Sequence, residues 1–139
     1  MNAPILASSV SDFWGKRWNT AFRDLTHRFL FRPLAARLGP RGSILAGFLC
    51  SGLVHDAVIS VPAGGGYGLP TAYFLIQAVA LLFERSALGR RLGLMRGYRG
   101  WLFTMTVLLA PAAWLFHPPF VRHVILPFME FAAALTPAS

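Results

Sequence analysis

The residue with the clearest chemical potential is His55, which lies in an otherwise apolar stretch, Ser43–Val61. At about 1.5 Å per residue a helix over this stretch reaches about 28 Å, close to the roughly 30 Å of a bilayer's hydrocarbon core. We therefore expect a membrane span over 43–61, with His55 about 18 Å along its axis. An ionisable ring at that depth usually faces a cavity or pathway, although a hydrogen bond to a neighbouring helix is the alternative.

One face of this expected span consists of small residues. Ser51, Gly47 and Ser43 precede His55 at intervals of four, so they share its side of a helix. Another helix or a slim ligand can approach closely along such a strip. The adjacent Asp56 points about 100° away and needs a partner or water of its own.

A second candidate for chemistry is Asn19, within a segment whose periodicity predicts an amphipathic helix over 9–31. Ser9 and Asp12 resemble a capping box at its start, and Pro33 favours an end just before it. Asn19 lies at the seam of the two faces, where it is either functional or a solvated amide. Tryptophan on one face and basic residues on the other are typical of a helix in the lipid headgroup plane. The apolar face comprises Trp14, Trp18, Phe22, Leu25 and Phe29.

The composition excludes several classes of protein. With 55% hydrophobic residues over 139, the chain is too apolar for a soluble domain of this size. The formal charge of +8 comes from basic residues that flank apolar stretches, so it indicates membrane orientation rather than nucleic-acid binding. The single cysteine, Cys50, excludes an internal disulfide, and no set of metal ligands is visible.

Three further spans are predicted, over 68–83, 101–116 and 120–135, the last of which either crosses or lies at the interface. The glycines of 62–70 indicate a tight turn, because no Lys-Ser/Thr follows them as a phosphate loop requires. The sequence thus predicts one all-α, polytopic membrane domain over 1–139, with about four spans after the amphipathic helix.

Arginine is distributed unequally between the segments that flank these spans. The segments 16–41 and 84–100 are rich in arginine, whereas 62–70 and 117–119 have none. The positive-inside rule places the first two segments in the cytoplasm and the other two outside.

Several motifs resemble one known family. They are DFWGKRWN at 12–19, RDLTHRFLFRPL after it, SGLVHD at 51–56 and WLFTMTVLLAPAAWLFHPP at 101–119. Together they resemble the membrane-bound O-acyltransferase superfamily, and within it the wax synthases, which are long-chain-alcohol O-fatty-acyltransferases. Two departures are that Asp56 replaces the family's usual Glu, and that members have further spans before the first motif, so the chain resembles a carboxyl-terminal half.

The resemblance implies a function and a set of site residues. It implies transfer of a fatty acyl group from acyl-CoA, a co-substrate rather than a bound cofactor, to the hydroxyl of a lipophilic alcohol in the bilayer. His55 would act as general base, and Asn19 would donate to the thioester carbonyl or orient the acceptor. Trp14, Trp18, Arg17 and Arg23 are the expected acyl-CoA contacts, although headgroup contact explains the two arginines equally well.

Two questions stay open from the sequence. The small-residue strip has no evident cover within the chain, which predicts association with another copy or with an amino-terminal half. The competing function is a non-catalytic membrane protein, with His55, Asp56 and Glu130 in a proton or ion pathway, or an inactive fragment of an acyltransferase.

Overall fold

The computed structural model describes residues 3–18, 24 and 27–134, and within these ranges every regular element is helical and no strand occurs. The predicted all-helical fold is therefore confirmed. In chain order the elements are η1 (Pro4–Leu6), α1 (Val10–Asp12), η2 (Phe13–Arg17), η3 (His27–Phe31), α3 (Arg32–His55), η4 (Asp56–Ser60), α4 (Val61–Ala63), α5 (Leu69–Glu84), α6 (Ala87–Arg91), α7 (Gly97–Leu109), α8 (Ala112–Leu115), α9 (Pro118–Phe120), η5 (Val121–Ile125) and α10 (Leu126–Ala134).

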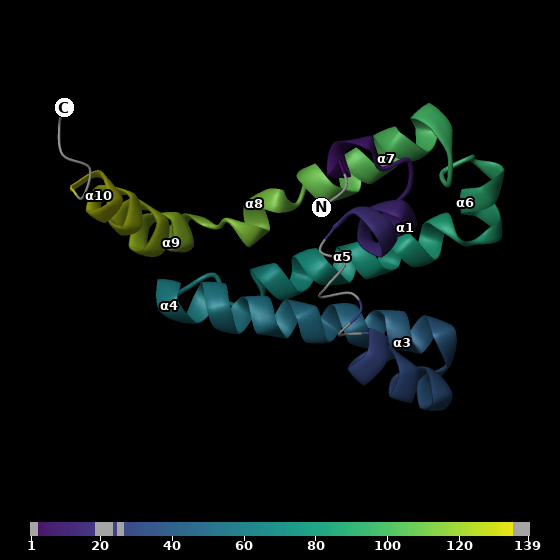
Figure 1. Cartoon of the computed structure of the whole chain (residues 1–139), viewed down its shortest axis with the longest axis horizontal. Coiled ribbons are helices and arrows are strands. Elements are labelled where there is room, and N and C mark those ends of the chain that lie inside the picture. Colours follow the sequence, from purple (N-terminus) through teal and green to yellow (C-terminus); the bar gives the residue numbers. More distant parts are fainter. Residues whose placement is uncertain (1–2, 19–23, 25–26, 135–139) are drawn as a thin grey trace.

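The central unit is a hairpin of two antiparallel helices, α3 and α5, with α7 on the other side of α5 (Figure 1). The expected tight turn over 62–70 connects the hairpin, and Gly66 in it has a φ of 77°, which glycine adopts readily. At Gly52 the two helices approach so closely that a Cβ would lie 2.7 Å from the Cα of Thr71. The hydrophobic core lies around α5 and comprises Val10, Phe48, Tyr73, Phe74, Ala78, Ala80 and Leu81.

The first predicted span lies within one long helical stretch. α3 is bent at Gly39, whose φ of 72° and ψ of 176° are not helical. From Pro40 the helix continues through η4 and α4 to Ala63, so residues 43–61 are helical throughout. Among the described residues, Arg32–Ala63 is the one helix that is long and apolar enough to cross a membrane by itself.

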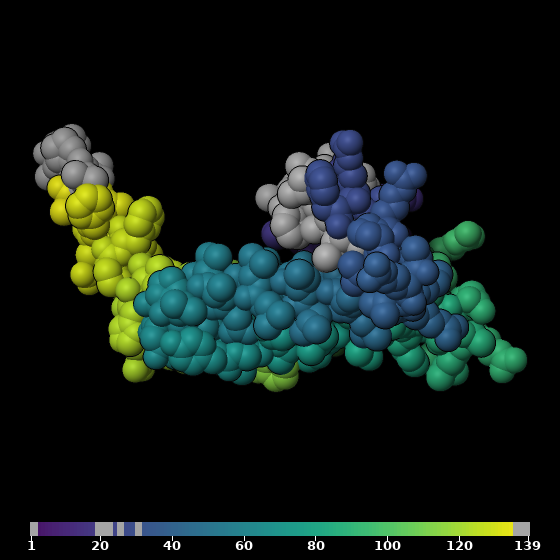
Figure 2. Space-filling view, turned by 90° about the horizontal axis from the view of Figure 1, so that it is seen from below, coloured from purple at the N-terminus to yellow at the C-terminus, as the bar shows by residue number. Residues whose placement is uncertain are grey.

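The C-terminal part of the chain is broken into shorter helices. α7 and α8 are separated at Pro111, where a kink was expected, and α9 to α10 then turn away by 58°. The helices Gly97–Leu115 and Pro118–Ala134 are long and apolar enough to cross a membrane only if the bent pair is counted as one span. α5 alone is too short to cross. α10 buries none of its residues and projects from the packed body (Figure 2). One or two spans are thus supported by length and composition, and four spans stay a prediction.

The amphipathic helix predicted over 9–31 is not continuous, which corrects the sequence interpretation. Its start is as expected, because the Ser9 side chain caps the helix by accepting from Asp12 N. Helical structure ends at Arg17, and Trp18 has extended backbone angles. The Trp18 ring stacks on Phe13 with centroids 5.5 Å apart, so packing between rings outweighs helical periodicity here.

The expected end of that helix at Pro33 is also wrong. η3 runs directly into α3, and Pro33 is the second residue of α3. Pro33 lies where the π-helical pattern of η3 gives way to α-helix, so its missing N–H falls at a junction and not in the middle of a regular helix. Between Trp18 and η3, residues 19–23, 25 and 26 lie outside the described residues.

Candidate functional site

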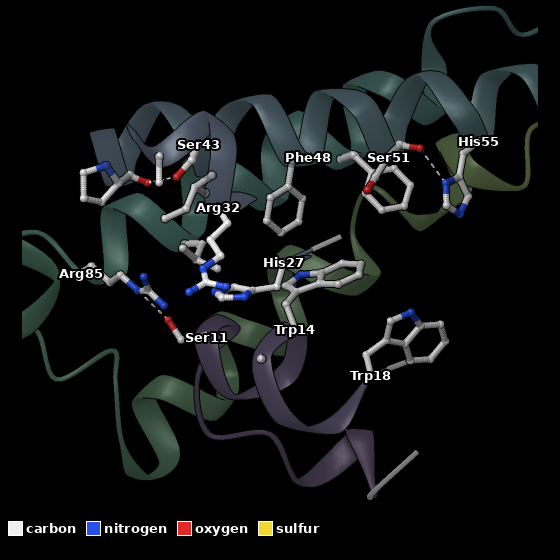
Figure 3. A pocket seen from close by; sticks show the side chains of 17 residues that line it. Ser11, Trp14, Trp18, His27, Arg32, Ser43, Phe48, Ser51, His55 and Arg85 are labelled. Atoms are coloured by element: carbon white, nitrogen blue, oxygen red, sulfur yellow. Dashed lines mark hydrogen bonds between the residues drawn. The ribbon is translucent and has the colours of Figure 1, made fainter. Parts of the chain in front are cut away.

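The small-residue face predicted on α3 forms one wall of a cavity of about 640 Å³. Ser43, Gly47, Ser51 and His55 all line it, as the spacing of four indicated. The opposite walls come from the N-terminal segment and α5 (Figure 3). The strip therefore borders a cavity within the described part of the chain.

His55 lies at one end of this cavity, and its ring has a defined orientation. Nδ1 lies 2.7 Å from the carbonyl oxygen of Ser51. A carbonyl only accepts hydrogen bonds, so Nδ1 carries a proton, and in the neutral ring Nε2 then has the lone pair. The ring packs beside Phe74 at a centroid distance of 4.4 Å. This is the arrangement of an imidazole that can accept a proton at Nε2.

Two of the aromatic residues predicted as acyl-CoA contacts lie on the same cavity. Trp14 packs edge-on against Phe48, with centroids 5.4 Å apart, and its Nε1 lies 3.4 Å from Gln77 Oε1. Trp18 lines the cavity on the side of His55 (Figure 3). The N-terminal segment therefore supplies an aromatic wall opposite the small-residue face of α3.

The other predicted site residues are not brought to the cavity wall. Arg17 forms an ion pair with Asp12 at 2.6 Å and donates to the carbonyl of Ala3, and it is absent from the residues that line the cavity. Asn19 and Arg23 lie outside the described residues. Their predicted roles therefore stay predictions.

Basic side chains that the sequence interpretation did not single out gather at the other end of the cavity. Arg32 from the start of α3 and Arg85 from the end of α5 both line it, with His27 between them and Trp14 (Figure 3). Arg85 Nε donates to Ser11 Oγ at 3.0 Å. The signal in the sequence was the arginine at each helix end, but only the hairpin brings these two ends together. The cavity thus runs from a cationic end to an imidazole.

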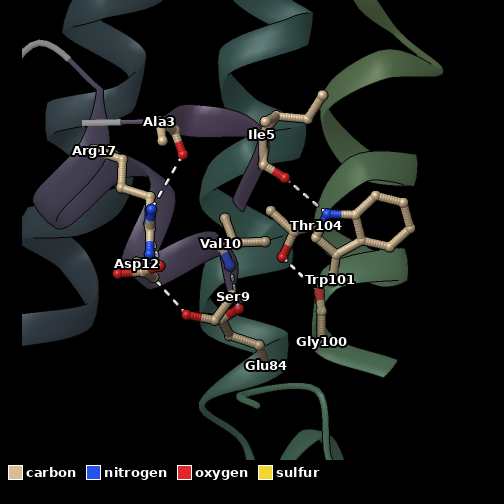
Figure 4. Close-up of polar contacts among 10 residues, drawn as sticks. All are labelled: Ala3, Ile5, Ser9, Val10, Asp12, Arg17, Glu84, Gly100, Trp101 and Thr104. Carbon is tan, nitrogen blue, oxygen red and sulfur yellow. Dashed lines mark hydrogen bonds and ion pairs between the residues drawn. The ribbon is translucent and has the colours of Figure 1, made fainter. Parts of the chain in front are cut away.

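A buried carboxylate holds the N-terminal segment in place, and the sequence interpretation missed it. Glu84 is 0% exposed, and its two oxygens accept from the backbone N–H groups of Val10 at 2.7 Å and Ser11 at 2.8 Å (Figure 4). The start of a helix has unpaired N–H groups and a positive partial charge, so a carboxylate is favourable there. On the other side, Trp101 Nε1 donates to Ile5 O at 2.8 Å. These contacts fix the aromatic wall against α5 and α7.

Comparisons with known proteins agree with the motifs. Residues 1–77 match the family described as "Membrane bound O-acyl transferase family". The chain is 31% identical over 135 residues to "Long-chain-alcohol O-fatty-acyltransferase" of Simmondsia chinensis, covering 88% of this chain and 38% of the relative. It is 30% identical over 137 residues to "Probable long-chain-alcohol O-fatty-acyltransferase 7" of Arabidopsis thaliana, covering 86% and 39%.

A relative with a different printed acceptor is similarly close. "Acyl-CoA--sterol O-acyltransferase 1" of Arabidopsis thaliana is 28% identical over 141 residues, covering 87% of this chain and 38% of the relative. The chain thus spans about two fifths of the length of these curated relatives. No solved structure matches the chain significantly.

Proposed function

Because the chain belongs to the membrane bound O-acyl transferase family, we propose that it carries the catalytic base of an enzyme that transfers a fatty acyl group from acyl-CoA to a lipophilic alcohol. The observation that carries this proposal is the orientation of His55, whose Nδ1 bond to Ser51 O leaves Nε2 available at the cavity. The named relatives supply the reaction class, and the cavity supplies a place where both substrates can meet.

In the proposed reaction, Nε2 of His55 accepts the proton of the alcohol hydroxyl as the oxygen attacks the thioester carbonyl. A carbon–oxygen bond forms, the carbon–sulfur bond breaks, and the CoA thiolate takes a proton back from the imidazolium. Asn19 follows Trp18 in the sequence, and we propose that its amide donates to the thioester carbonyl or orients the alcohol.

The cationic end of the cavity supports binding of the CoA portion. Guanidinium groups bind phosphate through charge-assisted, often bidentate, hydrogen bonds. We assign this role to Arg32 and Arg85 in preference to Arg17, which is paired with Asp12. The pantetheine arm of CoA then lies along the wall that includes Phe48, so that the thioester carbonyl lies near His55.

The arrangement of the two ends of the bundle supports the proposed membrane orientation. The starts of α3 and α6 lie at one end, and the α4–α5 turn lies at the other (Figure 1). At that other end, a Cβ on Gly66 would lie 2.5 Å from the His117 ring, so the predicted outer loop and the Pro-Pro turn are neighbours. The proposal therefore keeps the segments 16–41 and 84–100 on the cytoplasmic side of a multi-pass protein.

An ion pathway that joins Glu130 to His55 has no support in this arrangement. Glu130 lies on α10, which projects away from α3 (Figure 1). Among the helix pairs that pack closely within the described residues, α3 and α10 do not occur together.

The assignment of the cationic end can be tested with purified protein in lipid vesicles. We expect ester formation from radiolabelled acyl-CoA and a long-chain alcohol, and Arg32→Gln or Arg85→Gln should raise KM for acyl-CoA about 10-fold, because a charged hydrogen bond is lost. With an acyl thioester of N-acetylcysteamine, which has no phosphate, the same variants should behave as the wild type. An absence of ester with the complete protein that contains this segment would contradict the proposed function, whereas an equal loss with both thioesters would contradict the phosphate assignment alone.

A further inference from the structure

Asp56, which directly follows His55, belongs to a polar network that the proposed reaction does not use. Its Oδ1 accepts from Ser60 Oγ at 2.9 Å and from the backbone N–H of Gly68 at 2.8 Å. Its Oδ2 accepts from the backbone N–H of Thr71 at 3.2 Å and from Thr71 Oγ1. Gly68 and Thr71 stand at the start of α5, where backbone N–H groups lack helical acceptors. A side chain of the α3–η4 helix therefore caps the neighbouring helix.

The same turn of α5 also contacts the imidazole. Phe74 follows Thr71 by three residues, so the two side chains share a face of α5. Phe74 is buried, and its ring centroid lies 4.4 Å from that of His55. Gly52 of α3 meets the backbone of Thr71 with no room for a Cβ. The position of Thr71 along α3 therefore decides where Phe74 lies against the His55 ring.

The helix geometry changes directly after His55. Residues Asp56–Ser60 form the π-helical segment η4, whereas α3 is α-helical from Pro40 to His55. π-helical turns are rare and occur frequently at functional sites, because the wider turn redirects side chains. Asp56 is the first residue of this segment, so its bonds to α5 fix the point at which the redirection starts.

Resting on the proposed role of His55, we propose that Asp56 is a positioning residue that acts through Thr71 and Phe74. Its carboxylate holds the first turn of α5 in register with α3, and Phe74 then holds the His55 ring with Nε2 directed into the cavity. Asp56 is absent from the residues that line the cavity, so it acts without touching a substrate. A carboxylate here is stable because its oxygens receive hydrogen bonds from Ser60, Gly68 and Thr71.

The test compares kcat and KM per unit of folded protein for variants of the network. Thr71→Val removes only the hydroxyl donor, whereas Thr71→Ser keeps it. Asp56→Asn replaces one accepting oxygen by an amide N–H₂, which then faces the N–H or O–H donors that this oxygen had accepted from. We expect kcat to fall about 10-fold in Thr71→Val and about 100-fold in Asp56→Asn, with KM for acyl-CoA unchanged, because small misplacements of a reacting group are costly. Thr71→Ser should restore the wild-type kcat.

A matched control separates positioning from general destabilisation. Thr104 is a buried threonine of α7 that does not line the cavity, and its hydroxyl donates to Gly100 O at 2.7 Å. Thr104→Val should lower the thermal midpoint and leave kcat unchanged. The double variant Asp56→Asn/Thr71→Val should be no slower than Asp56→Asn, because both act on one unit.

The possible outcomes distinguish this inference from the function on which it rests. Wild-type kcat in folded Thr71→Val and Asp56→Asn, with an inactive His55→Ala, would overturn the positioning role alone. An active His55→Ala would overturn both. If Asp56→Asn does not fold, the Thr71→Val and Thr71→Ser pair decides the question.

Discussion

The two ends of the helical bundle satisfy their polar groups in different ways. At the arginine-rich end, Glu84 binds backbone N–H groups of the N-terminal segment, and Arg85 reaches Ser11 while it also lines the cavity. At the opposite end, Ser60 connects Asp56 to His117, and none of these three residues lines the cavity. The arginine-rich end, called the basic end below, thus places cationic side chains beside the cavity. At the other end, called the closed end, the polar side chains bond to one another.

This difference suggests that the two ends of the helices have different roles. The closed end joins η4, α5 and α9 through polar contacts. Asp56 of η4 accepts from Gly68 N before α5, Ser60 of η4 lies 3.3 Å from His117 Nε2, and His117 Nδ1 accepts from Phe120 N of α9. The basic end keeps charged groups beside an open volume. A charged ligand is therefore expected at the basic end, and a fixed framework for His55 at the closed end.

The comparison predicts that the two ends lie on opposite sides of a membrane. The largest expected effect is therefore a difference in chemical labelling between them. Tyr67 and Tyr98 are 65% and 72% exposed and lie at the closed and basic ends, respectively. In a Cys50→Ser background, Tyr67→Cys should react with an impermeant thiol reagent added outside intact cells, and Tyr98→Cys should react only after permeabilisation.

Cys50 must be replaced in this experiment because it is exposed and would react itself in detergent. Labelling of Tyr98→Cys alone would reverse the orientation. Labelling of both positions in intact cells would place the two ends on one side and remove the four-span arrangement.

A smaller effect is expected from weakening the contact that distinguishes the basic end. Glu84→Gln keeps one accepting oxygen and turns an amide N–H₂ toward a backbone donor, so we expect a loss of about 2 kcal/mol in the free energy of unfolding. Thermal unfolding in detergent measures it, and proteolysis should become faster near the N-terminal segment. Glu130→Gln, a change of the same kind on the exposed helix α10, should leave stability unchanged. Equal midpoints for Glu84→Gln and the wild type would contradict the anchoring role of Glu84.

The elements with strong hydrophobic patterns were predictable from the sequence. The helix in the segment 68–83 corresponds to α5 at Leu69–Glu84, whereas its crossing of a membrane stays a prediction. The residues that share a face with His55 were predicted correctly, because a regular helix fixes which residues lie on one side. The break at Trp18 was not predictable, because ring stacking on Phe13 decides it and periodicity does not contain that information.

Contacts between distant segments explain the remaining differences. Glu84 was grouped with a basic segment, although it lies at the end of an apolar helix, where a carboxylate needs buried donors. Those donors are more than seventy residues away in the chain, at Val10 and Ser11. Arg32 and Arg85 line the same cavity only because α3 and α5 pack side by side. Such relations depend on tertiary packing, which single-sequence patterns do not encode.

The central claim is that His55 is the base for acyl transfer, and a pair of histidine variants tests it most directly. His123 bonds the carbonyl of Ala63 through Nδ1 at 2.7 Å, the same distance as His55 to Ser51, but it does not line the cavity. Radiolabelled ester should be measured per unit of folded protein for His55→Ala and His123→Ala. The account predicts a fall of about 10² to 10⁴-fold for His55→Ala and wild-type activity for His123→Ala. Wild-type specific activity in His55→Ala would contradict it.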